Sequence, residues 1–425
     1  MNIVLNIILW IAYVVSLYFS VFLLLVYFDK REGFKNEKSS LTPKKNPLVS
    51  ILVPAYNEEG TILKTLISIN NLDYPKKLLD VIVIDDGSKD KTKSIVQEYI
   101  QDKAHFRLIS HKNCGKAASM NRALSLAKGE FFACLDADSF VHKDTLKKML
   151  SLYYDKADPR LAIITPAMKV YSPSNILQKI QWLEYLVIIL IARVSSHLDS
   201  LYVAPGPFSL YRTEIIRNLG GFDEKSIVED QEIAYKIQKN NYRVAQCFDG
   251  YVYTVAPKKI KPFYKQRRRW YLGSIICLKK YKEMIANRKY GDFGLMQMTK
   301  NVIGYMLAIT GITIAVYLIL FPLFHRLKNL IVIKFSIIPY LMAFLDFNFS
   351  LMSLLLADFK KGFIVLFLFC IGALFFYLAH KNANEKISKF GWIPIIPYFL
   401  FYYLLKGSIL LLSLANFARK KKLKW

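Results

Sequence analysis

The chain has 425 residues, of which 54% are hydrophobic and 21% are charged, and its formal net charge at pH 7 is +27. Such a chain is too apolar to be disordered and is long enough for two or three structural units. The positive charge first suggests nucleic acid, but the hydrophobic fraction is high for a soluble nucleic-acid-binding protein. Apolar and basic segments in separate parts of a chain indicate a membrane protein whose positive charge faces the cytoplasm. The five cysteines form no C-x-x-C pair, which argues against a structural zinc site or a disulfide scaffold.

Residues 1–28 contain no charged side chain, and a bilayer crossing needs about 20 residues. The segment lacks the basic start and the small-residue cleavage site of a signal peptide, so we expect a retained transmembrane helix. Basic residues follow directly: Lys30, Arg31, Lys35, Lys38, Lys44 and Lys45. By the positive-inside rule, the N-terminus is expected outside and the following domain in the cytoplasm.

Residues 46–290 alternate short apolar runs with charged helical patterns. The apolar runs are Val49–Asn57, Leu79–Ser88, FRLIS, EFFACLDAD and LAIITPA. The helical patterns are Glu58–Asn70, Lys91–Gln101, Lys116–Ala127 and Asp144–Tyr154. This alternation predicts an α/β domain with a mainly parallel sheet, in which ligands bind outside the carboxyl ends of the strands. No G-x-G-x-x-G or G-x-x-x-x-G-K-[ST] motif is present, which disfavours a dinucleotide dehydrogenase and a P-loop NTPase.

Three acidic motifs follow predicted strands or begin a predicted helix. In CLDADS, Asp136 and Asp138 lie two residues apart after an apolar strand and could share a hard cation. IDDGS places Asp86 in a second acidic turn, which could equally be an ordinary Asp/Gly turn. SIVEDQE places Glu229 and Asp230 at a helix start, where either could be a general base or only a helix-terminal charge.

The segment KKIKPFYKQRRRW (Lys258–Trp270) concentrates basic residues before a tryptophan. Its arginines and lysines could bind a diphosphate, and its indole ring could stack on a sugar. A basic segment of this kind could also simply lie on an anionic membrane surface.

The order of these motifs resembles that of the processive family 2 glycosyltransferases, which include cellulose, hyaluronan, chitin and poly-N-acetylglucosamine synthases. The matching features are an Asp-Asp turn, D-x-D, an acidic pair and Q-x-x-R-W, within an α/β domain that has one membrane span before it and several after it. The layout looks closest to the bacterial poly-N-acetylglucosamine synthases. The resemblance implies a Rossmann-like GT-A catalytic domain joined to a helical transmembrane region.

The resemblance also implies roles for individual residues. The nucleotide-sugar donor, expected to be a UDP-sugar, would be bound by Ala55, Tyr56, Glu58, Asp86, Lys116, Asp136, Gln266 and Arg269. Asp136 and Asp138 would hold Mg²⁺ or Mn²⁺. Asp230, beside Glu229, would be the base for the acceptor hydroxyl, and Trp270 would lie under the acceptor sugar. A single displacement would invert the anomeric centre.

Gly206 lies in the turn VAPGPFSLYR (Val203–Arg212), on the acceptor side by the same resemblance. The synthases usually carry a Ser-Gly or Gly-Thr type of turn there. This departure slightly favours an alternative function, in which one sugar is added to a lipid carrier or glycolipid. The expected acceptor is therefore a growing polysaccharide, with a lipid-linked acceptor as the alternative.

The C-terminal third contains four more apolar segments within residues 301–417: Asn301–Phe324, Phe335–Ala357, Gly362–His380 and Phe390–Phe417. Five crossings predict a multi-pass plasma-membrane protein, with the basic tail, residues 418–425, in the cytoplasm. The expected partners are therefore a nucleotide sugar, an acceptor, the lipid bilayer and accessory subunits, but no nucleic acid.

Residues 178–198 are apolar, but the uncharged stretch between Glu184 and Arg193 is too short to cross. We expect an interfacial helix there, with a buried core helix as the alternative, and a second interfacial helix at residues 263–278. Asp346 and Lys406 fall inside predicted spans at similar depths. They are expected either to pair or to face a polar path, unless the span boundaries are misplaced and one side chain reaches an interface.

Overall fold

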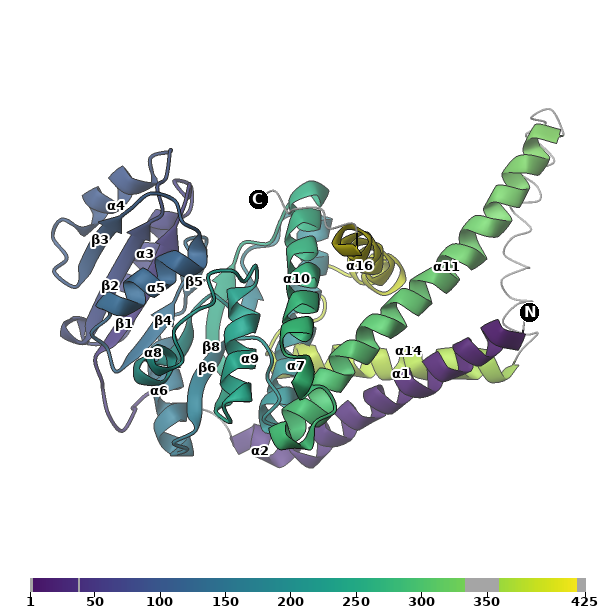
Figure 1. Cartoon of the computed structure of the whole chain (residues 1–425), viewed down its shortest axis with the longest axis horizontal. Helices are drawn as coiled ribbons and strands as arrows, with labels where there is room; N and C mark the ends of the chain where they lie inside the picture. Colours follow the sequence, from purple (N-terminus) through teal and green to yellow (C-terminus); the bar gives the residue numbers. More distant parts are fainter. Residues whose placement is uncertain (1–2, 37–38, 333–358, 419–425) are drawn as a thin grey trace.

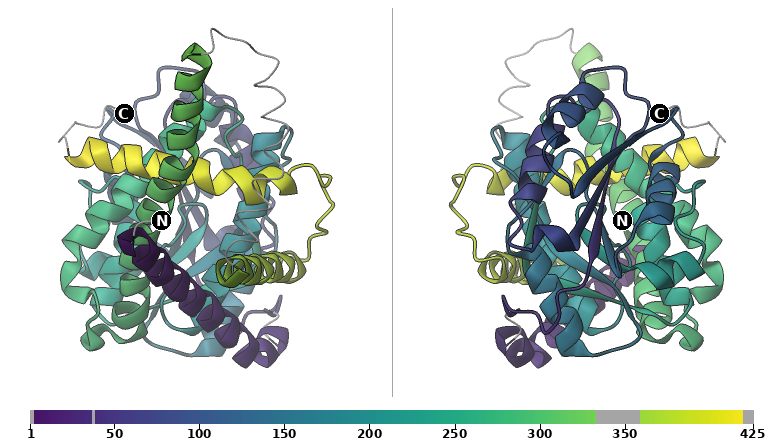
Figure 2. Two further views of the ribbon diagram at one scale, coloured as in Figure 1. Left: turned by 90° about the vertical axis from the view of Figure 1, so that its right-hand side faces the viewer. Right: turned by 90° about the vertical axis from the view of Figure 1, so that its left-hand side faces the viewer.

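The computed structural model describes residues 3–36, 39–332 and 359–418. Within these residues the chain forms an α/β half, built on a sheet, and a helical half at the other end of the molecule (Figure 1). The two views along the long axis show the same division, with mainly helices facing the viewer in one and the sheet in the other (Figure 2).

The sheet of the described residues has eight strands in the order β3-β2-β1-β4-β7-β6-β8-β5. The strands are β1 (Val49–Ala55), β2 (Leu79–Asp85), β3 (Phe106–Ser110), β4 (Phe131–Cys134), β5 (Ser139–Val141), β6 (Leu161–Val170), β7 (Ser209–Arg212) and β8 (Arg243–Thr254). Strands β1 to β4 are mutually parallel, as are β6 and β8, whereas β7 and β5 run antiparallel to their neighbours. The expected mainly parallel sheet is confirmed, with two antiparallel strands that were not predicted.

The helices around the sheet are α3 (Ile62–Asn70), α4 (Thr92–Ile100), α5 (Lys116–Leu126), α6 (Thr145–Lys156), α8 (Thr213–Asn218) and α9 (Glu229–Lys239), with a short turn η1 (Lys76–Leu78). Successive residues of β1 point to opposite faces of the sheet. Ile51 packs in one buried cluster with Leu66 of α3, and Leu52 packs in another with Met120 of α5. Helices therefore cover both faces of the sheet. Polar side chains stay accessible at the edge formed by the carboxyl ends of the parallel strands.

The helical half contains α1 (Ile3–Asp29), α2 (Arg31–Asn36), α7 (Ile176–His197), α10 (Ile260–Lys280), α11 (Thr299–Val332), α14 (Phe359–Asn382) and α16 (Tyr403–Ala418). Shorter elements are η2 (Lys282–Met284), η3 (Arg288–Tyr290), the π-helical η4 (Phe293–Met298), α15 (Ile395–Pro397) and the π-helical η5 (Tyr398–Tyr402). The last two elements lead without interruption into α16. Helix α7 packs against β6 and β8 on one side and α14 on another, with Trp182 and Leu186 buried. It therefore joins the two halves of the molecule.

Three helices of the described residues are long and apolar enough to cross a membrane: Asn6–Asp29, Gly362–Asn382 and Ile395–Phe417. Large apolar side chains stand exposed on them, such as Val14 on α1 and Phe363 on α14. The predicted span at residues 301–324 falls within α11, and the one at residues 335–357 lies outside the described residues.

Among the described residues, Lys406 has a partner that the sequence did not suggest. Its Nζ lies 2.6 Å from Glu184 Oε1 of α7, and Asp346 lies outside the described residues. The spacing of charges within predicted spans could not reveal this pair, because Glu184 belongs to the helix between the sheet and the spans.

Candidate active site

The loops after β1, β2 and β4 meet at one edge of the sheet. The register pairs Ala55 with Asp85 and Leu52 with Cys134, so these parallel strands end close together. The first two loops also brace each other, since Lys89 N donates to Asn57 Oδ1 at 2.8 Å and Asn57 N donates to Ser88 Oγ at 3.0 Å. The sequence-predicted acidic residues thus follow strands whose ends converge.

Three carboxyl groups are close enough at this edge to disturb one another. Burial and the carboxylates of Asp136 and Glu58 raise the pKa of Asp138 to about 6. Burial also raises the pKa of Glu58, against a hydrogen bond from Thr61 and with a further contribution from Asp136. Crowded, partly desolvated carboxylates repel one another, and a hard divalent cation relieves that repulsion. The donor set therefore fits the Mg²⁺ or Mn²⁺ expected there.

Lys116, at the first position of α5, links this acidic edge to α9. Its Nζ lies 2.6 Å from Asp136 Oδ1 and 2.7 Å from Glu229 Oε1. The D-x-D motif and the acidic pair of α9 are thus bridged by a single ammonium group. The family resemblance implies that Lys116 lies near the nucleotide, but nothing in the sequence indicated this bridge, because the two partners of Lys116 lie 20 and 113 residues away.

Gly206 lies directly against the bridge. A Cβ atom at this position would be 2.9 Å from Lys116 Nζ and 3.0 Å from Asp136 Oδ2. The turn that carries Pro205 and Pro207 therefore passes over the Asp136 carboxylate, and a larger residue at position 206 would displace the ends of these two side chains.

Replacing Gly206 by alanine is expected to displace Lys116 or Asp136 and to lower kcat/KM for the sugar donor by about tenfold or more. Steady-state kinetics of nucleotide release measures this effect. Gly60→Ala is the matched control, because a Cβ at Gly60 would meet nothing within 4 Å. Equal kinetics of the two variants would contradict the placement of Gly206 in the site.

The two acidic residues at the start of α9 differ in their surroundings. Burial raises the pKa of Glu229, but the Lys116 ammonium outweighs it, so the pKa is lowered. Burial and the Glu229 carboxylate raise the pKa of Asp230 to about 6, against Lys116 and Arg269. The Asp230 carboxylate accepts a hydrogen bond from Gln231 N at 2.8 Å. Glu229 thus neutralises a lysine, whereas Asp230 has a proton affinity suited to acid–base chemistry.

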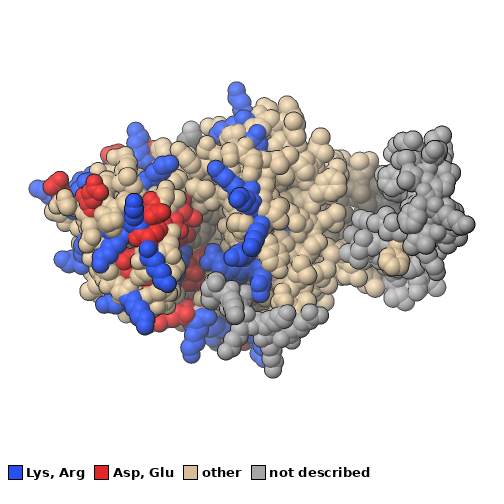
Figure 3. Space-filling model, turned by 90° about the horizontal axis from the view of Figure 1, so that it is seen from above, with Lys and Arg blue, Asp and Glu red and all other residues tan. Residues whose placement is uncertain are grey.

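A cavity of about 640 Å³ lies between Asp138 and the Q-x-x-R-W segment of α10. The basic or polar side chains that line it with Asp138 are Thr61, Lys258, Lys265, Gln266, Arg268 and Arg269. Gln266 Oε1 is buried and has no hydrogen-bond partner among the described residues. Seen from above, charged side chains gather on the α/β half, and the exposed surface of the helical half is largely uncharged (Figure 3). A cavity with this lining can hold an anionic ligand such as a diphosphate.

Two other sequence-predicted residues, Trp270 of the Q-x-x-R-W motif and Asp86 of the Asp-Asp turn, are not among the residues that line this cavity. Trp270 is half-buried, outside the lining of that cavity, with the Arg267 guanidinium 4.2 Å from its ring centre. Asp86 is buried and accepts hydrogen bonds from Cys114 N at 2.8 Å and Gly115 N at 3.0 Å. Asp86 therefore orders the loop that leads into Lys116.

His111 and Cys114 were not singled out by sequence reasoning. Ligand atoms of Asp86, His111 and Cys114 lie within 4.8 Å of one another, which makes this group a second potential metal-binding cluster. The only signal for His111 and Cys114 in the sequence was the run HKNCG directly before Lys116.

The two residues expected to bind the donor after β1 differ in exposure. Tyr56 is exposed just after the strand, whereas the side chain of Ala55, the last residue of β1, is buried in the core.

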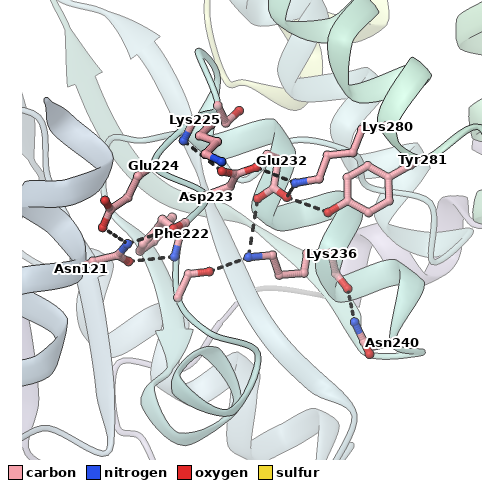
Figure 4. A network of polar contacts seen from close by, with 12 residues as sticks. Asn121, Phe222, Asp223, Glu224, Lys225, Glu232, Lys236, Asn240, Lys280 and Tyr281 are labelled. Carbon is pink, nitrogen blue, oxygen red and sulfur yellow. Dashed lines mark hydrogen bonds and ion pairs between the residues drawn. The ribbon is translucent and has the colours of Figure 1, made fainter.

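A network of polar contacts around the buried Glu232 carboxylate ties α9 to the end of α10 (Figure 4). Glu232 Oε1 accepts hydrogen bonds from Lys280 Nζ and Tyr281 Oη, both at 2.6 Å. Lys280 Nζ also lies 2.6 Å from Asp223 Oδ2. Because Glu232 follows Asp230 by two residues, the network fixes the acidic pair relative to the helix that carries Q-x-x-R-W.

Comparison with known proteins agrees with this geometry. Residues 50–220 match the sequence profile of the family described as Glycosyl transferase family 2. The chain is 27% identical to a poly-beta-1,6-N-acetyl-D-glucosamine synthase of Staphylococcus epidermidis, over 99% of this chain and 96% of that protein. It is also 27% identical to a Staphylococcus aureus synthase of the same name, over 68% of this chain and 70% of that protein.

Among solved structures, a mannosyltransferase of Pyrobaculum calidifontis, in complex with GDP-Man and Mn²⁺, has the same fold. The TM-score is 0.61 at 19% sequence identity, and the match covers 97% of this chain and 99% of that chain. Residues 50–220 therefore match a family 2 glycosyltransferase domain, the fold is GT-A-like, and the resemblance expected from the motifs is confirmed.

Proposed function

We propose that the protein is a membrane-embedded, metal-dependent, inverting glycosyltransferase that extends a β-linked polysaccharide from a nucleotide sugar. The observation that carries this proposal is the Lys116 bridge, with Nζ contacts of 2.6 Å to Asp136 and 2.7 Å to Glu229. It brings the D-x-D edge, suited to a donor diphosphate, next to Asp230, suited to activate an acceptor. The Staphylococcus epidermidis relative, which matches nearly the full chain, supports poly-N-acetylglucosamine as the product and therefore UDP-N-acetylglucosamine as the donor.

In this proposal Asp230 acts as the general base. Its ionised carboxylate takes the proton of the acceptor hydroxyl as the hydroxyl oxygen forms a bond to the anomeric carbon of the donor sugar. The bond from that carbon to the diphosphate oxygen breaks, and UDP leaves with the electron pair. Attack opposite the leaving group inverts the anomeric centre. Glu229 stays paired with Lys116, so it holds the lysine in place and takes no proton.

Asp136 and Asp138 would hold Mg²⁺ or Mn²⁺, with Glu58 nearby, and such an ion would neutralise charge on the diphosphate. Arg269 and Gln266 would bind the same diphosphate from α10, since both line the cavity that Asp138 enters. Lys116 would maintain the position of Asp136 and add positive charge next to the departing group.

The raised pKa of Asp230 predicts the pH dependence of the reaction. Its carboxylate is the basic form, and with a pKa of about 6 it is mostly protonated below pH 6 and mostly ionised above it. Turnover is therefore expected to rise with pH through about pH 6 and to level off above pH 7. Measuring kcat at saturating donor from pH 5 to pH 8 tests this. A constant kcat across that range would contradict the assigned role.

The helical half would hold the catalytic domain at the cytoplasmic face of the plasma membrane and pass the product outward. Helix α1 and the apolar helices at residues 362–382 and 395–417 support the embedding. The proposed order is a span at residues 1–28, a catalytic domain at 46–290, four spans within 301–417 and a basic cytoplasmic tail at 418–425. An N-terminal epitope tag should be accessible to antibody on intact cells, and a tag accessible only after permeabilisation would contradict this orientation.

The reaction is tested with purified protein in lipid nanodiscs, supplied with labelled UDP-N-acetylglucosamine, UDP-glucose, UDP-glucuronic acid or GDP-mannose. We expect release of UDP and transfer of label from UDP-N-acetylglucosamine with Mg²⁺ or Mn²⁺, and loss of both in EDTA. Preference for another donor would revise the product, and absence of transfer from every donor would contradict the proposal.

A second candidate function is transfer of one sugar to a polyprenyl phosphate or glycolipid. The turn around Gly206 slightly favours it, because Pro205 and Pro207 flank this glycine where the synthases usually carry a Ser-Gly or Gly-Thr type of turn. In the same nanodisc assay this function would give one labelled species that is extractable with organic solvent.

A further inference from the structure

The Glu184 carboxylate is buried where α7, α10 and α16 meet. Its Oε1 accepts a hydrogen bond from Lys406 Nζ at 2.6 Å, and its Oε2 accepts bonds from Tyr402 Oη at 2.7 Å and from Arg267 Nη2. The side chains of Glu184 and Arg267 are only 6% and 3% exposed. We call these four residues the Glu184 junction.

The Glu184 junction is ionised in the folded protein. Burial raises the pKa of Glu184, but the charges of Lys406 and Arg267 outweigh burial and hold the pKa at about 2. One carboxylate faces two cations, so the junction has a net charge of about +1 and its only described anionic member is Glu184. Neutralising Glu184 would leave the buried Arg267 and the partly buried Lys406 without this counter-charge.

Arg267 also contacts Trp270, the residue that the family resemblance places beneath the acceptor sugar. Its guanidinium carbon lies 4.2 Å from the ring centre of Trp270, three residues later on α10, within cation–π distance. Its sequence neighbours Gln266 and Arg268 line the cavity that Asp138 enters, as does Arg269. Helix α10 thus directs one set of side chains into the cavity while Arg267 is anchored in the Glu184 junction.

We propose that Glu184 and Lys406 are positioning residues that set the orientation of α10, and through Arg267 the orientation of Trp270. The inference rests on the proposed function for the role of Arg269, and on the family resemblance for the role of Trp270 beneath the acceptor sugar. Buried ion pairs contribute little net stability compared with apolar packing, and their best-attested use is to specify one geometry. Lys406 also connects this geometry to α16, which lies in an apolar helix that can cross a membrane.

The π-helical segment η5 supports a specific geometry at the α16 end of the junction. Residues Tyr398–Tyr402 form this segment immediately before α16, and its last residue, Tyr402, lies four positions before Lys406. Both side chains reach the same carboxylate of Glu184. Single π-helical turns within helices often occur at functional sites.

The decisive variant is Glu184→Gln, which keeps the size of the side chain and removes its charge. Arg267 is then free to turn towards the anionic ligand in the cavity, and Trp270 loses its fixed neighbour. We expect KM for the nucleotide sugar to stay within about twofold, and kcat for transfer to the acceptor to fall by about tenfold or more. Products should be shorter, and UDP release without transfer should rise as a fraction of turnover. Glu184→Asp, which retains the charge, should recover part of the transfer.

Glu385→Gln is the matched control. Glu385 forms another buried ion pair, 3.0 Å from Lys169 of β6, with side-chain exposures of 7% for the lysine and 11% for the glutamate. It should lower thermal stability yet preserve the ratio of transfer to UDP release and the product length. A merely structural role for Glu184 would make both variants lose donor binding and transfer in proportion to stability, and that result would overturn the inference.

A second readout does not depend on catalysis. The chain has five tryptophans, so ¹⁹F NMR of 5-fluorotryptophan-labelled protein gives few resonances, and Trp270→Phe assigns the one of interest. Glu184→Gln should shift or broaden the Trp270 resonance, and Glu385→Gln should leave it unchanged. If Glu184→Gln is not recovered folded, Arg267→Lys must give the same shift of the Trp270 resonance. It must also lower kcat while leaving KM for the nucleotide sugar nearly unchanged. An unchanged Trp270 resonance overturns the inference, whereas absence of transfer by the unmodified protein overturns only the proposed function.

Discussion

Replacing Asp230 by asparagine is expected to reduce sugar transfer by about 10²–10⁴-fold, the contribution typical of a general base. The amide keeps the shape of the side chain and its backbone hydrogen bond to Gln231, but it cannot take the proton of the acceptor hydroxyl. Binding of UDP should remain within a few-fold of the unmodified protein, because the cavity residues on α10 and the D-x-D edge are unchanged. Single-turnover transfer and UDP titration measure the two quantities separately.

Asp199→Asn is a matched control for Asp230→Asn. Asp199 is another carboxyl whose pKa is raised by burial, and it pairs with Arg243 at 2.6 Å in a different part of the domain. Its replacement should leave transfer within about twofold, as expected for a change outside the site. Loss of UDP binding together with transfer in Asp230→Asn would show that Asp230 holds the donor, and would contradict its role as a base.

Asp138→Asn is expected to abolish metal-dependent donor binding and to lower kcat/KM by about 10²-fold or more, since it removes a charged ligand oxygen from the proposed cation site. Electron paramagnetic resonance titrations measure the lost metal binding, because more of the free Mn²⁺ signal should remain with the variant than with the unmodified protein. The exposed carboxylate Asp155, which pairs with Lys44 at 3.2 Å, provides the control Asp155→Asn.

Asp138→Asn is expected to lower activity but not to lower the stability of the fold. Because the folded-state pKa of Asp138 is raised to about 6, the ionised carboxylate destabilises the folded protein above that pH. Without metal at pH 7.5, Asp138→Asn should therefore unfold at the same temperature as the unmodified protein or at a higher one. A lower unfolding temperature would mean that Asp138 stabilises the fold and that loss of activity reflects damage to the structure.

Much of the α/β half could be predicted from the sequence because its strands are short apolar runs. The predicted runs that begin at Val49 and Leu79 became β1 and β2, and the predicted helix from Lys116 became α5 with the same first residue. Strand β8 was missed because its sequence, RVAQCFDGYVYT, alternates polar and apolar residues and lacks a continuous apolar run. Strand β7 has only four residues and directly follows the Pro-Gly-Pro turn.

The candidate site was predictable only as a set of residue types. The motifs indicated which side chains carry chemistry, and parallel strands imply that Asp86 and Asp136 lie at one edge. They could not reveal that Lys116 joins Asp136 to Glu229, because that contact depends on how α5 and α9 approach the sheet edge. For the same reason nothing in the sequence indicated that tertiary packing brings Lys406 to Glu184.

The central claim is that this site makes a polymer from a nucleotide sugar, and product analysis tests it most directly. Purified protein in lipid nanodiscs is incubated with radiolabelled UDP-N-acetylglucosamine and Mg²⁺ or Mn²⁺, and the label is separated by size and by extraction with organic solvent. The proposed function predicts long, water-soluble or gel-retained chains that are absent with Asp230→Asn. Label confined to one extractable lipid species would contradict it.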